Sequence, residues 1–173
     1  MEIRKTSNRV KTRFLMVAFT GSLILGCASA PENRLLLDLA MYTKPGFVVL
    51  EEDGRLWVFR EGSEDLVAFE ESKDLVKQVI RPKAAPGSVT VKSTESSTID
   101  EYLTTLPGFY TRMEDGRLWV FKRDSVELET FLQTGKPAKQ VVRPLAGPFG
   151  LTIKAVSTGV LDEYLAAGEA FSG

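Results

Sequence analysis

The chain contains a tandem duplication. Pro45–Leu103 aligns with Pro107–Leu165 at a constant offset of 62 residues, with no gap and with 27 of the 59 positions identical. The best-matched blocks read PGF, EDGRLWVF, KQV, RP and DEYL. Self-similarity at a fixed period indicates that each copy is one structural unit. Because a unit of about 60 residues buries only about 60% of its unfolded surface, we expect the first copy (residues 45–106) and the second copy (residues 107–173) to pack as one body.

An Asp-Gly pair predicts a β-hairpin near the start of each copy. Asp53-Gly54 and Asp115-Gly116 each separate two runs of β-branched, aromatic and aliphatic residues. Asp-Gly favours a two-residue type I′ turn, because both central residues of that turn need a positive φ. The turn fixes the register, so that Glu52 pairs with Arg55 and both faces of the hairpin are largely apolar.

The remainder of each copy predicts a helix, two strands and a closing helix. Ser63 and Ser125 are suited to cap the first helix, Gly135 to end it in the second copy, and Ser97 or Gly159 to cap the closing helix. We therefore expect an α+β fold: a tandem duplication of a ββαββα unit with a mainly antiparallel sheet, helices packed on it and pseudo-twofold symmetry. We further expect eight strands in one arrangement, with one hairpin face buried between the copies and hairpins rather than parallel crossovers within each copy.

The segment before the first copy follows the register of the closing helix. Leu37-Asp38 lies where Ile99-Asp100 lies one copy later, and a Pro-Gly-Phe sequence follows at the same distance in both places. This spacing predicts a leading helix at residues 34–44. The helix would leave residues 27–33 as a tether.

The N-terminus has the pattern of a secretory signal. A basic leader precedes Phe14–Leu25, which has no charged residue but, at twelve residues, is shorter than the ~20 that a membrane-spanning helix needs. The sequence Leu23-Ile24-Leu25-Gly26-Cys27 then resembles the lipobox of bacterial lipoproteins. An ordinary signal peptide cut after Ala28 or Ala30 is the alternative.

The lipobox resemblance implies a location. Cleavage would remove residues 1–26 as the signal peptide, and lipidation of Cys27, the only cysteine in the chain, would anchor the protein in a lipid bilayer. Ala28 follows where an aspartate would signal retention in the inner membrane. The resemblance therefore implies a periplasm-facing envelope lipoprotein, at the outer membrane if the host has one.

Composition excludes several classes of function. The chain has no histidine, which excludes a Ser-His-Asp triad, a Cys-His pair and histidine-ligated zinc or haem. Without residues 1–26 it has 17 Lys and Arg against 22 Asp and Glu, a net charge of −5 that is poorly suited to nucleic acid. No phosphate-binding loop or nucleophile elbow is present. We expect no enzyme activity, no cofactor, no metal and no nucleic-acid partner.

Basic residues on adjacent predicted strands are the candidate ligand site. Lysine and arginine pair with carboxylates, phosphates and acidic glycans, although basic side chains on strands also prevent edge-to-edge pairing. Trp57 and Trp119 form a candidate aromatic surface for a carbohydrate or peptide, with core packing as the alternative. The basic candidates are Lys77, Arg81 and Lys92, and, in the second copy, Lys139, Arg143 and Lys154.

Three functions follow from these observations. The first is a non-catalytic binding module of the envelope, with an envelope protein or polymer as partner. The second is a binder of a small anionic ligand or acidic glycan, which requires the basic strands to converge on one cavity. The third is a cell-wall enzyme that uses two carboxylates within ~10 Å of each other in a cleft.

Overall fold

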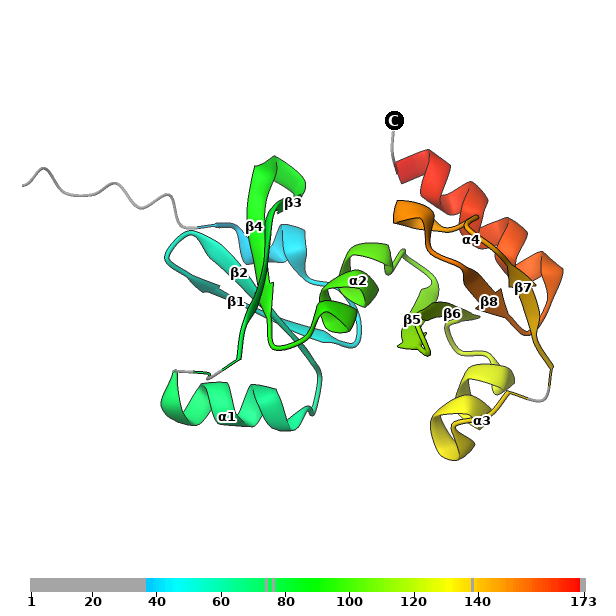
Figure 1. Cartoon of the computed structure of the whole chain (residues 1–173), viewed down its shortest axis with the longest axis horizontal. Coiled ribbons are helices and arrows are strands. Elements are labelled where there is room, and N and C mark those ends of the chain that lie inside the picture. The colour runs from blue at the N-terminus through cyan, green and yellow to red at the C-terminus, as the bar shows by residue number, and fades with distance from the viewer. Residues whose placement is uncertain (1–36, 74, 76, 138, 172–173) are drawn as a thin grey trace, which may run out of the picture. The chain divides into compact units, whose positions relative to one another are not determined.

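A computed structural model describes residues 37–73, 75, 77–137 and 139–171, which include most of both copies (Figure 1). The expected signal peptide at residues 1–26, Cys27 and the expected tether at residues 27–33 lie outside the described residues. Within the described part of the chain, no helix has both the length and the apolar character needed to cross a membrane.

Each copy folds into a four-stranded mixed sheet with helices packed on it, so the α+β fold and the repeated ββαββα unit are confirmed (Figure 1). The order of strands is β1-β2-β4-β3 in the first sheet and β5-β6-β8-β7 in the second. The first copy contains β1 (Phe47–Glu52), β2 (Arg55–Arg60), α1 (Glu64–Ser72), β3 (Val79–Ala85), η2 (Pro86–Ser88), β4 (Val89–Ser93) and α2 (Ser96–Thr104). The second contains β5 (Phe109–Glu114), β6 (Arg117–Lys122), α3 (Val126–Thr134), β7 (Val141–Arg143), η3 (Pro148–Gly150), β8 (Ile153–Ala155) and α4 (Thr158–Phe171).

The predicted hairpin and its register are confirmed. Asp53 and Gly54 have φ values of 53° and 71°, as a type I′ turn requires. Glu52 pairs with Arg55 across β1 and β2, and the second copy repeats this register between β5 and β6.

The connection within each copy differs from the prediction. β2 pairs with β4 in parallel, and β6 with β8, so each copy contains a parallel crossover; the other two pairings of each sheet are antiparallel. The expected eight-stranded arrangement is also wrong, because the strands form two separate sheets. The reason is that the crossover places α1 on one face of the hairpin while α2 lies on the other, so each copy covers both faces by itself.

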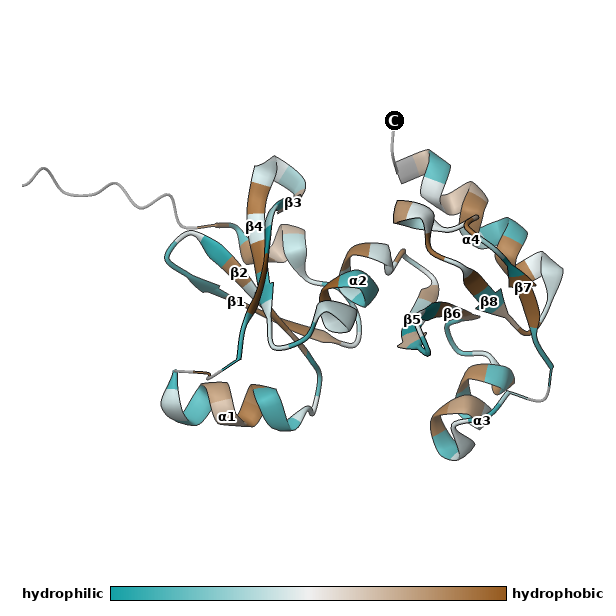
Figure 2. Ribbon diagram, viewed as in Figure 1, coloured by the Kyte–Doolittle hydropathy of each residue, from teal (hydrophilic) through white to brown (hydrophobic). Residues whose placement is uncertain are grey.

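Two small cores lie on opposite faces of each sheet. In the first copy, one core packs Leu56, Val58 and Val91 against α2, and the other packs Trp57 and Phe59 against α1. The second copy repeats both cores. The helices α1 and α3 accordingly alternate apolar with hydrophilic residues (Figure 2).

The leading helix is shorter than predicted. Its described part is a single 3-10 turn, η1 (Leu39–Tyr42), which the side chain of Asp38 caps by accepting from the Ala40 amide. The backbone is extended at Thr43, two residues before Pro45, and the helix cannot continue.

η1 nevertheless occupies the place predicted from the register. The Tyr102 hydroxyl donates to the carbonyl of Tyr42 at 2.8 Å, and the Tyr164 hydroxyl donates to the carbonyl of Thr104 at 2.8 Å. The two donors are 62 residues apart, and so are the two acceptors. The end of the preceding helix therefore packs against each copy in the same way. The copies therefore contact each other head to tail within one compact unit; the pseudo-twofold axis stays a prediction.

Candidate functional site

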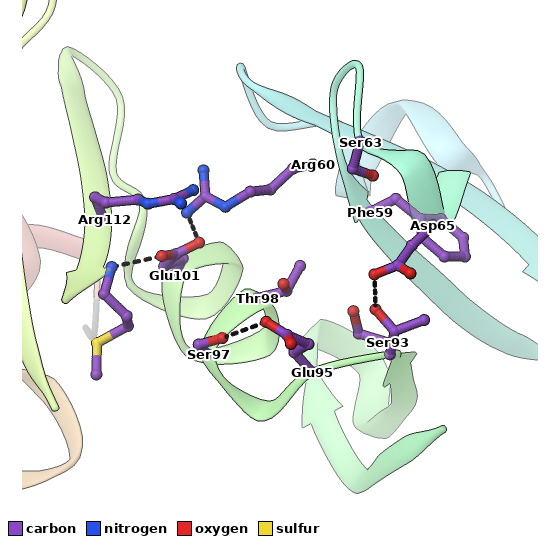
Figure 3. Close-up of a pocket in the computed structure, with 12 residues that line it drawn as sticks. Phe59, Arg60, Ser63, Asp65, Ser93, Glu95, Ser97, Thr98, Glu101 and Arg112 are labelled. Carbon is purple, nitrogen blue, oxygen red and sulfur yellow. Dashed lines mark hydrogen bonds and ion pairs between the residues drawn. The ribbon is translucent and has the colours of Figure 1, made fainter. Parts of the chain in front are cut away.

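A cavity lies at the corresponding corner of each copy. It is placed where the last strand of the copy turns into the closing helix, beside the start of the middle helix; Figure 3 shows the cavity of the first copy. We call these the first corner cavity, of about 300 Å³, and the second corner cavity, of about 640 Å³. The first is lined by Phe59, Arg60, Ser63, Asp65, Ser93, Thr94, Glu95, Ser97, Thr98, Glu101, Arg112 and Met113. The second is lined by Lys122, Ser125, Val126, Glu127, Thr130, Pro137, Lys139, Val156, Ser157 and Val160.

One wall of the first corner cavity is the start of α1. Ser63 caps this helix as predicted, since its Oγ accepts from the Leu66 amide at 3.3 Å. Asp65 follows in the first turn, where a carboxylate interacts favourably with the helix dipole. Its Oδ2 accepts a 2.6 Å hydrogen bond from the hydroxyl of Thr94, which joins α1 to the end of β4.

An ion pair and a strand from the second copy form the opposite wall (Figure 3). Arg60, at the end of β2, pairs with the carboxylate of Glu101 on α2, and that side chain is only 2% exposed. The other carboxylate oxygen of Glu101 accepts from the backbone amide of Met113 on β5. Arg112 adds a second guanidinium that is exposed and has no ion-pair partner among the described residues.

The two arginines influence each other. Burial, together with the like charge of Arg112, lowers the pKa of Arg60 to about 10. A hydrogen bond from Arg60 to Tyr110 acts in the opposite direction, but the lowering is larger. An anion that lies beside both guanidinium groups would therefore interact favourably with both positive charges.

The start of α2 has no side-chain cap. Its N-cap residue is Glu95, not Ser97 as the sequence indicated, and no side chain accepts from the first amides of the helix. The Glu95 carboxylate is engaged elsewhere: it accepts from the Ser97 hydroxyl at 3.3 Å and lies 3.9 Å from the Lys77 ammonium. In the second copy Ser157 takes the place of Glu95, and its Oγ accepts from the Val160 amide at 3.4 Å.

A buried hydroxyl also lacks a partner in the first corner cavity. Ser93 is fully buried at the end of β4, and its Oγ has no hydrogen-bond partner among the described residues. A buried hydroxyl left unpaired costs about 1–3 kcal/mol. The corresponding residue in the second copy is Ala155, and Val156 and Val160 likewise replace Thr94 and Thr98. The two cavities therefore share a place in the fold but differ in chemistry, the first being polar and the second more apolar.

The arginines among the predicted basic site residues are paired within their own copies. Arg81 pairs with Asp100 at the start of α2, and Arg143 lies 2.6 Å from Asp162 at the start of α4. Neither arginine lines a corner cavity.

The buried lysines of the same set cover the tryptophans. The ammonium of Lys92 lies 4.1 Å from the centre of the Trp57 ring and 3.4 Å from the Glu52 carboxylate, which also accepts from the indole N–H at 2.7 Å. Lys154 lies in the same way over Trp119. Trp57 and Trp119 are only 3% and 2% exposed, so the candidate aromatic surface is corrected: both indoles are core residues.

The remaining two lysines border cavities. Lys139 lines the second corner cavity, and Lys77 lines a small hollow next to the first, with Asp65 and Glu95. The predicted basic residues therefore do not meet in one cavity among those described.

Sequence reasoning missed the residues that do meet. Arg60 and Glu101 are distant in the sequence and meet because α2 packs on β2, and the packing of α2 against β5 then adds Arg112. Ser93 could have been found by asking where the two copies differ in polarity at a position expected to be buried, since Ala155 is its counterpart.

Comparison of the chain with protein-family models, with curated proteins and with solved structures finds no match.

Proposed function

We propose that this chain is a lipid-anchored protein of the bacterial cell envelope whose duplicated body is a non-catalytic binding module. One observation carries the binding function: both copies keep a cavity at the same corner while the lining has changed from polar to apolar. Protein interiors are otherwise closely packed, and concave sites with a few convergent polar groups are where proteins bind ligands.

We infer binding rather than catalysis because the carboxylates of the first corner cavity already have partners. Asp65 accepts from Thr94, and Glu101 pairs with Arg60. Glu95 accepts from Ser97. A cell-wall hydrolase needs one carboxyl group that is free to donate a proton and a second that is free to attack or to activate water.

The second corner cavity is the better candidate for a protein partner or an envelope polymer. It is the larger of the two, and Val126 at its edge is an apolar side chain that is 72% exposed. Exposed apolar residues around a concave surface are typical of interaction sites.

Photo-cross-linking in intact cells tests the binding function. A photoreactive amino acid would replace Val126 in the native full-length protein, and captured material would be identified by mass spectrometry. Leu145 is the matched control, because it is 75% exposed and lines neither corner cavity. We expect one dominant envelope component at Val126 and none at Leu145. The same capture at both positions, or no capture at Val126, would count against this role.

The anchor is tested separately. The lipobox-like sequence predicts that Cys27→Ser abolishes labelling by a radioactive fatty acid and moves the protein out of the detergent phase. Continued partition of the Cys27→Ser variant into detergent would contradict lipidation at Cys27.

A further inference from the structure

We propose that the first corner cavity binds a small zwitterion carrying both a carboxylate and an ammonium group, the chemistry of an amino acid or a short peptide. The proposal rests on the proposed binding function and gives it a class of ligand. The volume of about 300 Å³ lies at the lower end of the range for small-molecule sites, which limits the ligand to a small one.

The carboxylate has three kinds of donor available. The uncapped start of α2, a nine-residue helix, presents backbone amides that no side chain satisfies. The fully buried Ser93 hydroxyl has no partner among the described residues, and it could donate a hydrogen bond to a carboxylate in the cavity. Arg112 supplies a guanidinium without an ion-pair partner in the described structure, and arginine binds carboxylates through two parallel hydrogen bonds.

The ammonium group has acidic partners in the same lining. Asp65 has a second carboxylate oxygen beyond the one bonded to Thr94, and Glu95 faces the same space at the start of α2 (Figure 3). The Lys77 ammonium near Glu95 is 71% exposed and screens that carboxylate only weakly.

The balance of charges favours a zwitterion over a simple ion. Arg60 and Glu101 neutralise each other, which leaves Arg112 against Asp65 and Glu95 in the lining. A simple anion would be repelled by the two carboxylates, and a simple cation would leave the amides and the Ser93 hydroxyl unpaired. A ligand with both charges satisfies both the donors and the carboxylates of the lining.

The second copy lacks this set of groups. Ala155 replaces the buried hydroxyl, and Ser157 caps α4, so that neither the buried hydroxyl donor nor an uncapped helix start remains there. We therefore expect one zwitterion site per chain, and each difference between the copies supplies a variant that the fold already accommodates.

Calorimetric titration of the full chain, purified in detergent, tests the proposal. The probes are L-alanine and L-alanyl-L-alanine, with propionate and ethylamine as the separate halves of the zwitterion. We expect saturable binding at one site per chain for at least one zwitterion, and binding at least about tenfold weaker for either half. Binding of alanine alone would indicate a free amino acid, and binding of the dipeptide alone would indicate a peptide.

Three variants locate the site. Ser93→Ala and Glu95→Ser copy the second copy, and Arg112→Gln removes the exposed guanidinium; each should weaken binding at least about tenfold without lowering Tm. Arg55→Gln, at the exposed hairpin turn, is the control and should bind as the parent does.

Three results would overturn the proposal: no saturable heat with either zwitterion at about 10 mM, propionate binding as tightly as alanine, or unchanged binding in Ser93→Ala and Arg112→Gln. If cross-linking at Val126 still captures a partner, only this ligand class is lost. If that capture fails as well, the binding function itself is wrong.

Discussion

Gly147 lies so close to Ile153 that a Cβ atom on the glycine would overlap Cγ2 of the isoleucine. The first copy has Ala85 and Val91 at these positions, and both are buried in the same core. The glycine has an ordinary negative φ of −86°, so packing and not backbone conformation requires it. The extra methyl group therefore belongs to Ala85 in the first copy and to Ile153 in the second.

This relationship predicts a compensating pair of substitutions. Gly147→Ala should lower the free energy of unfolding by about 1–3 kcal/mol, because the added Cβ overlaps the fully buried Ile153. Ile153→Val alone should cost about 0.5–1.5 kcal/mol through the lost methylene. The double variant reproduces the first copy and should lie within about 1 kcal/mol of the parent in urea unfolding. Simple addition of the two single losses would contradict direct packing between these residues.

The features that the sequence predicted well are local or repeated. Asp53-Gly54 determines its own turn and the register of its hairpin, and Ser63 caps its own helix, so both could be inferred from short segments. The duplication gave the order of elements in each copy and the place of η1.

The features that were missed depend on long-range packing. Both hairpin faces are apolar, and nothing local shows whether α1 or the other copy covers the face that carries Trp57. The parallel pairing of β2 with β4 follows from that choice. Lys92 looked like a surface charge, but the Trp57 ring and Glu52 stabilise it in a buried position. The candidate site could not be predicted from the sequence for the same reason, since Arg112 lies beside Arg60 only when α2 is packed on β5.

The ion pair between Arg60 and Glu101 should stabilise the protein much more than the corresponding pair of the second copy. Glu101→Gln keeps an oxygen for the Met113 amide but leaves Arg60, whose side chain is only 20% exposed, as a charge without its partner. We expect a loss of about 3 kcal/mol in the free energy of unfolding, as for other buried pairs that lose one member.

The second copy supplies the control. Glu163 pairs with Lys122, but these side chains are 54% and 46% exposed. Exposed pairs contribute about 0–1 kcal/mol, so Glu163→Gln should change the free energy of unfolding by less than about 1 kcal/mol. Equal losses in the two variants would show that the packing of α2 against β5 does not bury the first pair in solution.

Two tyrosine hydrogen bonds test whether the copies unfold together. Tyr164→Phe leaves the carbonyl of Thr104 without its 2.8 Å donor, and Tyr102→Phe does the same to Tyr42. Each should cost about 1–2 kcal/mol. If the copies form one cooperative body, both variants lower the midpoint of a single transition, seen alike by circular dichroism and tryptophan fluorescence. Two separate transitions, only one of which moves in each variant, would indicate independent copies.

Lys44 predicts the pH dependence of stability. Its ammonium donates to the carbonyls of Tyr102 and Thr105 at 2.7 and 2.9 Å at the end of α2, and burial lowers its pKa from 10.5 to about 8. Between these values the unfolded chain holds the proton and the folded chain does not. The free energy of unfolding should therefore rise with pH from about 8, by up to about 1 kcal/mol per pH unit.

Lys44→Leu is the matched variant, because Leu106 holds the corresponding place in the second copy. Its free energy of unfolding in urea should lack the rise between pH 8 and 9.5 that the parent shows. Above pH 10 both proteins should lose stability, since burial raises the pKa of Tyr102 to about 12 and the unfolded chain releases that proton first. A parallel pH profile for parent and variant up to pH 9.5 would mean that Lys44 keeps its proton in the folded state, held by the two carbonyls.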